Sequence, residues 1–296
     1  MSGRADSSTR SSVEPADAKP SFWAAIRPIL AFGVCIGFVG FSLSLLGLLA
    51  RDLFHLPWLK ELSWWRIFRR CVSVSAALSL LILMRREHRS LRSFGFFAPA
   101  KGRRQFWAGL LLGLSMVAVL LGLVAAIGAC RLEVIANHAK IWFVLLTFLP
   151  SVVLIGVLEE LVFRGFILQH LLPYSRLLAV VLSSFLYAVV HVKTISWTSG
   201  LSRDLVGLFL LGGALALSFL QTHQLYFAVG LHAALAYGAR INKLFVDFAP
   251  DSLSWLVGTS RLTDGLLNWT VLLTMGAGIF WWGRSLRSRE VGHGRD

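Results

Sequence analysis

The sequence predicts an all-α, polytopic membrane protein with about eight transmembrane helices around a polar intramembrane site. Of its 296 residues, 56% are hydrophobic and only 15% are charged, and its mean hydropathy is +0.70. Soluble domains typically carry about a quarter charged residues. The apolar residues also gather in runs of about 20, the length that a helix needs to cross a bilayer. These observations exclude an ordinary soluble domain.

Eight apolar runs are candidate spans. They lie at residues 24–50, 67–84, 105–129, 141–158, 176–192, 204–221, 225–241 and 265–283. The fourth run continues directly into a stretch that contains two glutamates. We therefore expect one long helix there, bent near Pro150 because proline lacks a backbone N–H.

One membrane-embedded unit is expected between two tails. The first 20 residues are rich in Ser and Ala with mixed charge, a composition typical of disorder. The predicted organisation is a disordered cytoplasmic tail at residues 1–23, a transmembrane helical domain at 24–284 and a basic cytoplasmic tail at 285–296. The three cysteines lie far apart in the sequence, without the close pairing of zinc or redox motifs.

Basic residues give the chain a net charge of +14, and they gather beside the apolar runs. This distribution follows the positive-inside rule, so the expected partner is the lipid bilayer and no nucleic acid. The loop at 85–104 and the C-terminal tail are strongly basic, which predicts that both termini of an eight-span chain are cytoplasmic. The loop at 51–66 is basic too but carries three tryptophans, so we expect an amphipathic segment in the headgroup region. The long basic loops fit a bacterial inner membrane.

Two glutamates and an arginine interrupt the apolar stretch Ser151–Leu172. A charged side chain at the bilayer centre costs roughly 2.5 to 3.5 kcal/mol on insertion scales, so such residues usually face a partner or a wet cavity. On a helix, Glu160 and Arg164 share one face and can pair, whereas Glu159 is turned about 100° away. We therefore expect the Glu160 carboxylate in an ion pair and the Glu159 carboxylate on a different side of the helix. The alternative is that all three residues lie at the membrane boundary, where Glu and Arg are ordinary.

Two histidines, His191 and His232, lie on predicted membrane helices. A lone histidine there is more often a packing residue than a catalyst, but two of them beside two glutamates favour chemistry. A glutamate with two histidines can activate water directly or hold a metal ion that does so. His170 is left out, because it lies six residues beyond Arg164 on roughly the opposite face. The sequence contains neither a GxSxG elbow nor an HExxH motif.

Three short motifs follow one another in the segment at about 140–245, and their order and spacing are more specific than any one motif alone. They are a Glu-Glu-x-x-x-Arg motif, an aromatic-x-x-x-His motif and a third histidine-bearing helix. Their residues are Glu159, Glu160, Arg164, Tyr187, His191 and His232. Together they resemble the CAAX protease and bacteriocin-processing family, also called the CPBP or Abi family, whose members are intramembrane proteases.

This resemblance implies a role for each candidate site residue. Glu159 would be the general base acting on water, and His191 would activate or position that water. His232 would help stabilise the oxyanion, while Glu160 and Arg164 would supply a supporting ion pair. The residue types agree with this reading, because peptide hydrolysis without a covalent intermediate needs a base on the water and a donor for the oxyanion.

The chain departs from the family pattern at two positions. The family usually has Phe where this chain has Tyr187. Its third motif often carries Asn four residues after the histidine, where this chain has Ala236. Tyr237 or Asn242 could replace a donor missing at Ala236.

The leading hypothesis is a glutamate-type intramembrane endopeptidase that cleaves a membrane-associated protein or peptide. Two histidines and a carboxylate can also form a zinc site with an open position, but the resemblance favours no metal and no other cofactor. A non-catalytic scaffold or immunity-type protein of the same fold is the alternative, motivated by Ala236. A proton-coupled transporter ranks last, since the sequence has no evident repeated halves. A prenylated protein, a bacteriocin precursor and a signalling peptide all stay open as substrates.

Overall fold

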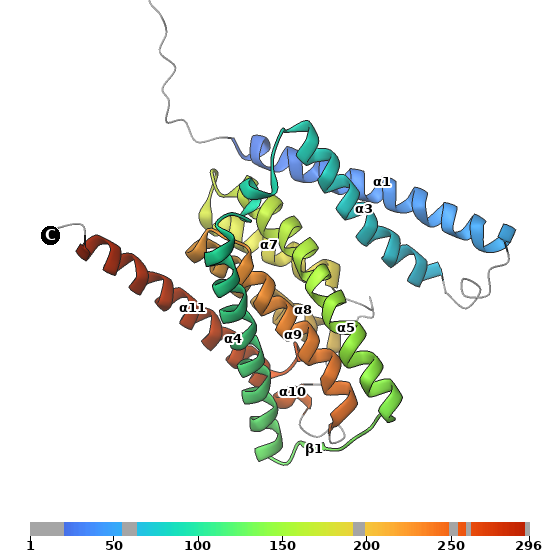
Figure 1. The fold of residues 1–296 in the computed structure, drawn as a ribbon, viewed down its shortest axis with the longest axis vertical. Coiled ribbons are helices and arrows are strands. Elements are labelled where there is room, and N and C mark those ends of the chain that lie inside the picture. The colour runs from blue at the N-terminus through green and yellow to red at the C-terminus, as the bar shows by residue number, and fades with distance from the viewer. Residues whose placement is uncertain (1–20, 55–63, 192–198, 249–253, 259–261, 294–296) are drawn as a thin grey trace, which may run out of the picture.

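The computed structural model describes residues 21–54, 64–191, 199–248, 254–258 and 262–293. These residues form a helical bundle with one very short sheet (Figure 1). The predicted tail at 1–23 therefore lies almost wholly outside the described residues, and so does most of the predicted headgroup segment at 51–66.

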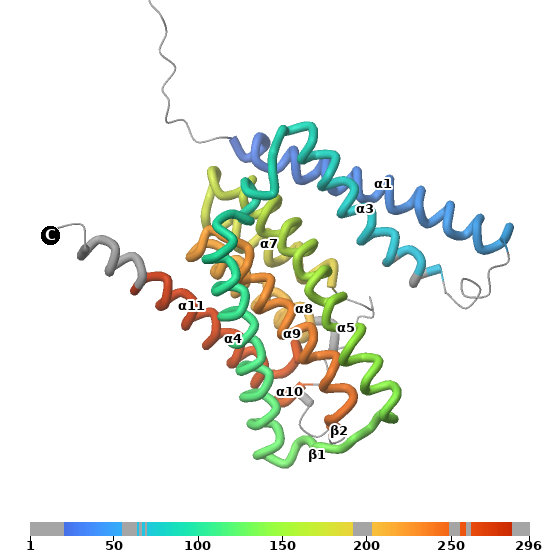
Figure 2. Tube along the Cα trace, viewed as in Figure 1, coloured from blue at the N-terminus to red at the C-terminus, as the bar shows by residue number. Residues whose placement is uncertain are grey.

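Helices follow one another along most of the described chain. They are α1 (Phe22–Phe54), α3 (Trp64–Arg86), η1 (Leu91–Phe94), α4 (Pro99–Ala126), α5 (His138–Glu160), η2 (Leu161–Leu168), α6 (Gln169–Leu171), α7 (Arg176–His191), α8 (Ser199–Thr222), α9 (Tyr226–Phe245), α10 (Ser254–Val257) and α11 (Leu266–His293). Figure 2 traces their path from end to end.

By length and composition, five helical stretches within the described residues could cross a membrane. They are Phe22–Phe54, Leu91–Ala126, His138–Leu171, Arg203–Thr222 and Leu266–Ser285. Helix α7 is apolar but shorter. The fold is thus a polytopic, almost entirely helical membrane protein, as predicted, while the predicted count of eight spans is not confirmed.

Helix α5 runs through Pro150 without interruption. The departure from α geometry comes eleven residues later, at Leu161, where the chain continues as the π-helix η2 directly after Glu160. Every residue of η2 is buried. Wide turns of this kind are frequently found at functional sites, and this one carries Arg164.

Two glycines, Gly109 on α4 and Gly230 on α9, allow these two helices to approach closely. A Cβ atom added to Gly109 would collide with the carbonyl oxygen of Phe227, and one added to Gly230 would collide with that of Phe106. Without side chains at the crossing, the two backbones can touch, which is a common way to pack helices in membranes. Helix α9 is thereby held against α4 on one face, and its other face remains for α5 and α8.

We expect Gly109→Ala to destabilise the protein by about 1–3 kcal/mol, since overpacking forces backbone shifts. The measurement is thermal unfolding in detergent. Gly122→Ala is the matched control on the same helix, because a Cβ there would meet no atom within 4 Å. An unchanged melting temperature for Gly109→Ala would contradict the close crossing.

Helices α1 and α3 form a hairpin beside the bundle (Figure 1). The first half of α1 joins the core, where the rings of Phe32 and Phe166 lie 4.8 Å apart. Its second half exposes large apolar side chains, among them Leu53, which is 72% exposed. Such a surface is stable only where hydrocarbon replaces water, in agreement with a membrane location.

The end of the bundle away from η2 carries a two-stranded antiparallel sheet. Strand β1 (Cys130–Leu132) pairs with β2 (Val246–Phe248), with Cys130 opposite Phe248. The sheet joins the connection between α4 and α5 to the end of α9. It fixes the start of α5 relative to α9, and these are the helices that carry the site glutamates and His232.

Candidate active site

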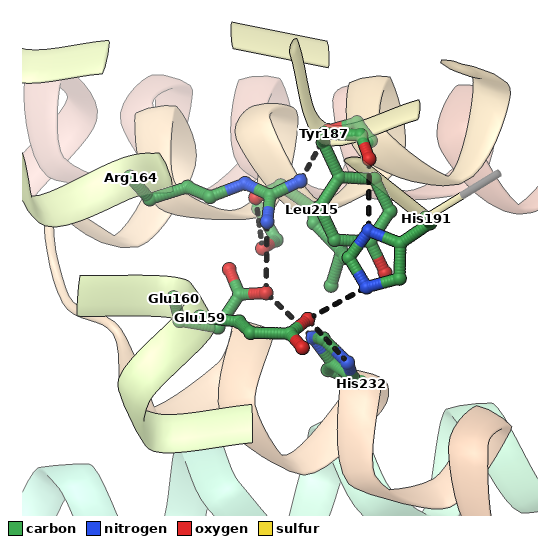
Figure 3. Close-up of polar contacts among 9 residues, drawn as sticks. Glu159, Glu160, Arg164, Tyr187, His191, Leu215 and His232 are labelled. Carbon is green, nitrogen blue, oxygen red and sulfur yellow. Dashed lines mark hydrogen bonds and ion pairs between the residues drawn. The ribbon is translucent and has the colours of Figure 1, made fainter. Parts of the chain in front are cut away.

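Three helices bring the candidate residues to one place inside the bundle (Figure 3). Glu159 and Glu160 are the last two residues of α5, His191 is the last residue of α7, and His232 lies in α9. Arg164 follows on η2. All five residues named from the sequence therefore meet in the structure, and none is left outside the cluster.

Glu160 and Arg164 form the ion pair predicted from their spacing. Arg164 Nη1 donates to Glu160 Oε1 at 2.8 Å, and both side chains are completely buried. Arg164 Nη2 donates to the backbone oxygen of Gly212 on α8 at 2.9 Å. Its guanidinium also lies over the ring of Tyr187, 4.8 Å from the centroid. A buried charge pair requires such further partners, because desolvation otherwise opposes it.

The same carboxylate oxygen orients His232. His232 Nδ1 lies 2.8 Å from Glu160 Oε1. Since that oxygen already accepts from Arg164, it acts as an acceptor, and His232 must carry its proton on Nδ1. The other nitrogen, Nε2, then points to Glu159 Oε2 at 3.4 Å. Glu160 thus fixes both the position and the tautomer of His232.

His191 is oriented in the same way by the backbone. Its Nδ1 lies 2.8 Å from the carbonyl oxygen of Tyr187, which can only accept. In the neutral ring Nε2 is then the unprotonated nitrogen, and it faces Glu159 Oε2 at 3.0 Å. This contact is favourable when a proton lies between the two atoms. Glu159 and His191 consequently form a pair that can share or pass one proton.

The two adjacent glutamates have different surroundings. The side chain of Glu159 is 24% exposed, and that of Glu160 is 0% exposed. Glu160 is committed to Arg164 and His232, whereas Glu159 contacts the imidazoles and also lines a cavity. The arrangement leaves Glu159 as the carboxylate that can reach a substrate or a water molecule.

The cavity has a volume of about 530 Å³. Glu159, His191 and His232 contribute to its polar part, and most of the other lining side chains are apolar. Its apolar lining includes Met116, Leu120, Phe148, Val152, Leu208 and Leu235. A mostly apolar cavity with a few convergent polar groups is the usual form of a ligand-binding site.

Ala236 also lines this cavity, one turn after His232. The two residues suggested as replacements for a donor at that position do not. Tyr237 donates its hydroxyl to the backbone oxygen of Leu145 at 3.1 Å, and Asn242 is buried away from the cavity lining. His170, which was left out, contacts the carbonyl oxygen of Phe166 on its own helical stretch.

Two contributors could not be identified as neighbours from sequence. They are the carbonyl oxygen of Gly212, which accepts from Arg164, and the hydroxyl-bearing ring of Tyr187, which lies between Arg164 and His191. Gly212 lies in an apolar run, and nothing in the sequence marks its backbone oxygen as an acceptor. Within the part of the chain that the structure describes, no group of three His, Cys, Asp or Glu side chains is arranged to hold a metal ion.

Fold and site together define an integral membrane protein with a carboxylate–histidine cluster inside a helical bundle. Residues 140–237, about a third of the chain, match the family model of type II CAAX prenyl endopeptidase Rce1-like proteins. The matched segment contains all five clustered residues and Ala236. The match confirms the resemblance drawn from the three motifs. No curated protein and no solved structure matches the chain.

Proposed function

We propose that this protein is an intramembrane endopeptidase of the CAAX-protease type, which hydrolyses a peptide bond in a membrane-associated protein or peptide. The observation that carries the proposal is the position of Glu159. Its carboxylate oxygen faces the cavity and lies 3.0 Å from His191 Nε2 and 3.4 Å from His232 Nε2. A carboxylate held in this way is placed to act on water in the cavity.

In the proposed reaction Glu159 accepts a proton from a water molecule, and the water oxygen attacks the carbonyl carbon of the scissile bond. The carbonyl oxygen becomes an oxyanion in the tetrahedral intermediate. The intermediate collapses when the carbon–nitrogen bond breaks, and the proton taken from water passes to the leaving amine. His191 supports both transfers, because its Nε2 can share the proton with Glu159 while its Nδ1 stays on the Tyr187 carbonyl.

The test uses the purified full-length chain in nanodiscs and a library of membrane-associated peptides, with and without a prenyl group. We expect wild type to cleave a subset of them, and we expect a chelator to leave the rate unchanged, because no step is assigned to a metal. Loss of cleavage on chelation, restored by zinc, would contradict the glutamate-type mechanism. Cleavage of neither peptide set by folded protein would overturn the endopeptidase.

A non-catalytic scaffold or immunity-type protein of the same fold is the second candidate. Ala236 favours it, since a methyl group lines the cavity where related proteins often have an amide donor. The two candidates differ in cells: a scaffold tolerates the nearly isosteric Glu159→Gln change, whereas an enzyme loses its phenotype.

A bacterial inner membrane with both termini in the cytoplasm completes the proposal. It is supported by the basic loop at 85–104 and the basic C-terminal tail. Accessibility labelling of single cysteines at the two termini, in intact cells and in inverted vesicles, tests it. Labelling of either terminus from outside intact cells would contradict this orientation.

A further inference from the structure

Peptide hydrolysis moves negative charge onto the carbonyl oxygen, and a preorganised hydrogen-bond donor there is usually among the largest contributions to catalysis. Most donors of the cluster are already committed. Arg164 gives Nη1 to Glu160 and Nη2 to Gly212, and the Nδ1 groups of both histidines are bound to the Tyr187 carbonyl and to Glu160. Both Nε2 atoms face Glu159. Among the described residues Arg164 Nε has no hydrogen-bond partner, but Arg164 is completely buried and lies outside the cavity lining. The oxyanion therefore needs a donor from another residue.

Tyr187 has a hydroxyl that meets this need. The residue is only 2% exposed, yet it lines the same cavity as Glu159 and His232. Within the described residues its hydroxyl has no hydrogen-bond partner, although its backbone oxygen accepts from His191. Figure 3 shows the ring running alongside the imidazole of His191, with its hydroxyl end toward the carboxylates.

The ring that carries this hydroxyl is held from several sides. Its centroid lies 4.2 Å from that of His191 and 5.2 Å from that of Phe163, which meets it edge on. The guanidinium of Arg164 covers it at 4.8 Å, and the ring of His232 stands nearly perpendicular to it at 6.0 Å. A donor fixed in this way needs no reorganisation when charge develops.

Other polar residues near the cavity are less suitable. Thr263 donates its hydroxyl to Asp204, and the hydroxyl of Tyr237 is used by the Leu145 backbone. Arg240 and Lys243 also line the cavity, but they follow His232 by eight and eleven residues. At 1.5 Å per residue they lie about 12 and 16 Å farther along α9. They are too distant to act on a carbonyl that Glu159 reaches.

We propose that the Tyr187 hydroxyl is a catalytic donor, which hydrogen-bonds the oxyanion of the tetrahedral intermediate. This inference rests on the proposed endopeptidase activity. The hydroxyl donates a hydrogen bond but keeps its proton throughout, so the proton balance of the reaction does not change. The Tyr187 phenol would thereby stabilise the developing charge opposite the base, Glu159.

The experiment measures kcat and KM of Tyr187→Phe on a peptide that wild type cleaves. Removing an oxyanion donor lowers kcat by roughly 10²- to 10³-fold in a well-studied protease, and we expect a loss of that size with little change in KM. The melting temperature should stay at the wild-type value, because the hydroxyl has no partner within the described protein. Tyr237→Phe is the matched control, and it should retain wild-type kcat.

A rescue variant separates catalysis from structure. Ala236 lines the cavity one turn after His232, so Ala236→Asn introduces an amide donor there, and we expect it to restore part of the kcat lost in Tyr187→Phe. Equal kcat for wild type and Tyr187→Phe would overturn the proposal, as would a loss explained by a lower melting temperature without rescue. If wild type cleaves and Glu159→Gln does not, the endopeptidase stands whatever the result at Tyr187. If wild type cleaves nothing, both fail.

Discussion

Glu159→Gln should abolish peptide cleavage while leaving the protein folded. A positioned general base contributes roughly 10²- to 10⁴-fold to a rate, so we expect kcat to fall by about three orders of magnitude or below detection. The amide has nearly the shape of the carboxylate but cannot take a proton from water. Because Glu159 lies outside the Glu160–Arg164 pair, the melting temperature in detergent should change little.

The matched control for this variant is Glu133→Gln. Glu133 is exposed and lies in the connection between α4 and α5, away from the cavity lining. The Glu133→Gln variant should cleave peptide at the wild-type rate. Full activity of Glu159→Gln would remove the central base from the mechanism and favour the scaffold.

Arg164→Met should be the most destabilising single change in the cluster. It leaves the Glu160 carboxylate completely buried, with His232 as its remaining partner. Breaking a buried pair by removing one partner typically costs 3–5 kcal/mol, about the size expected here, whereas replacing both partners with apolar groups can be nearly neutral. The double variant Glu160→Leu with Arg164→Met should therefore melt at a higher temperature than Arg164→Met alone, although it loses the orientation of His232 and its activity.

The exposed pair Arg51–Asp52 provides the control, because its N–O distance is the same 2.8 Å. Exposed ion pairs contribute little, so Arg51→Gln should melt like wild type. If Arg164→Met also melted like wild type, the buried pair would not support the bundle.

Local rules predicted the site well where the partners are close in sequence. The four-residue spacing of Glu160 and Arg164 was sufficient to predict their ion pair, and the 100° turn between the glutamates agrees with their different surroundings. No periodic pattern in the sequence relates α5, α7 and α9. Only the family resemblance therefore predicted that His191 and His232 would lie beside Glu159.

Features that depend on packing between distant segments could not be predicted. In the sequence Gly109 and Gly230 are ordinary residues of apolar runs, and their role depends on how the two helices cross. No glycine or proline pattern in the sequence predicts the π-helix η2. The pairing of β1 with β2 joins segments more than 100 residues apart. Tyr187 departs from the family pattern in the sequence itself, but the place of its hydroxyl in the cavity depends on packing against Arg164 and His191.

The hydrogen bond from Arg164 to the Gly212 carbonyl also bears on the order in which the site assembles as the chain is synthesised. Gly212 lies on α8, which is synthesised after α5, η2 and α7, and the same guanidinium aligns Glu160 and, through it, His232. A nascent chain in which α8 has not yet docked lacks this acceptor, and His232 on α9 has not yet arrived. The candidate site is therefore complete only after α8 and α9 have packed against α5 and η2, late in the assembly of the bundle.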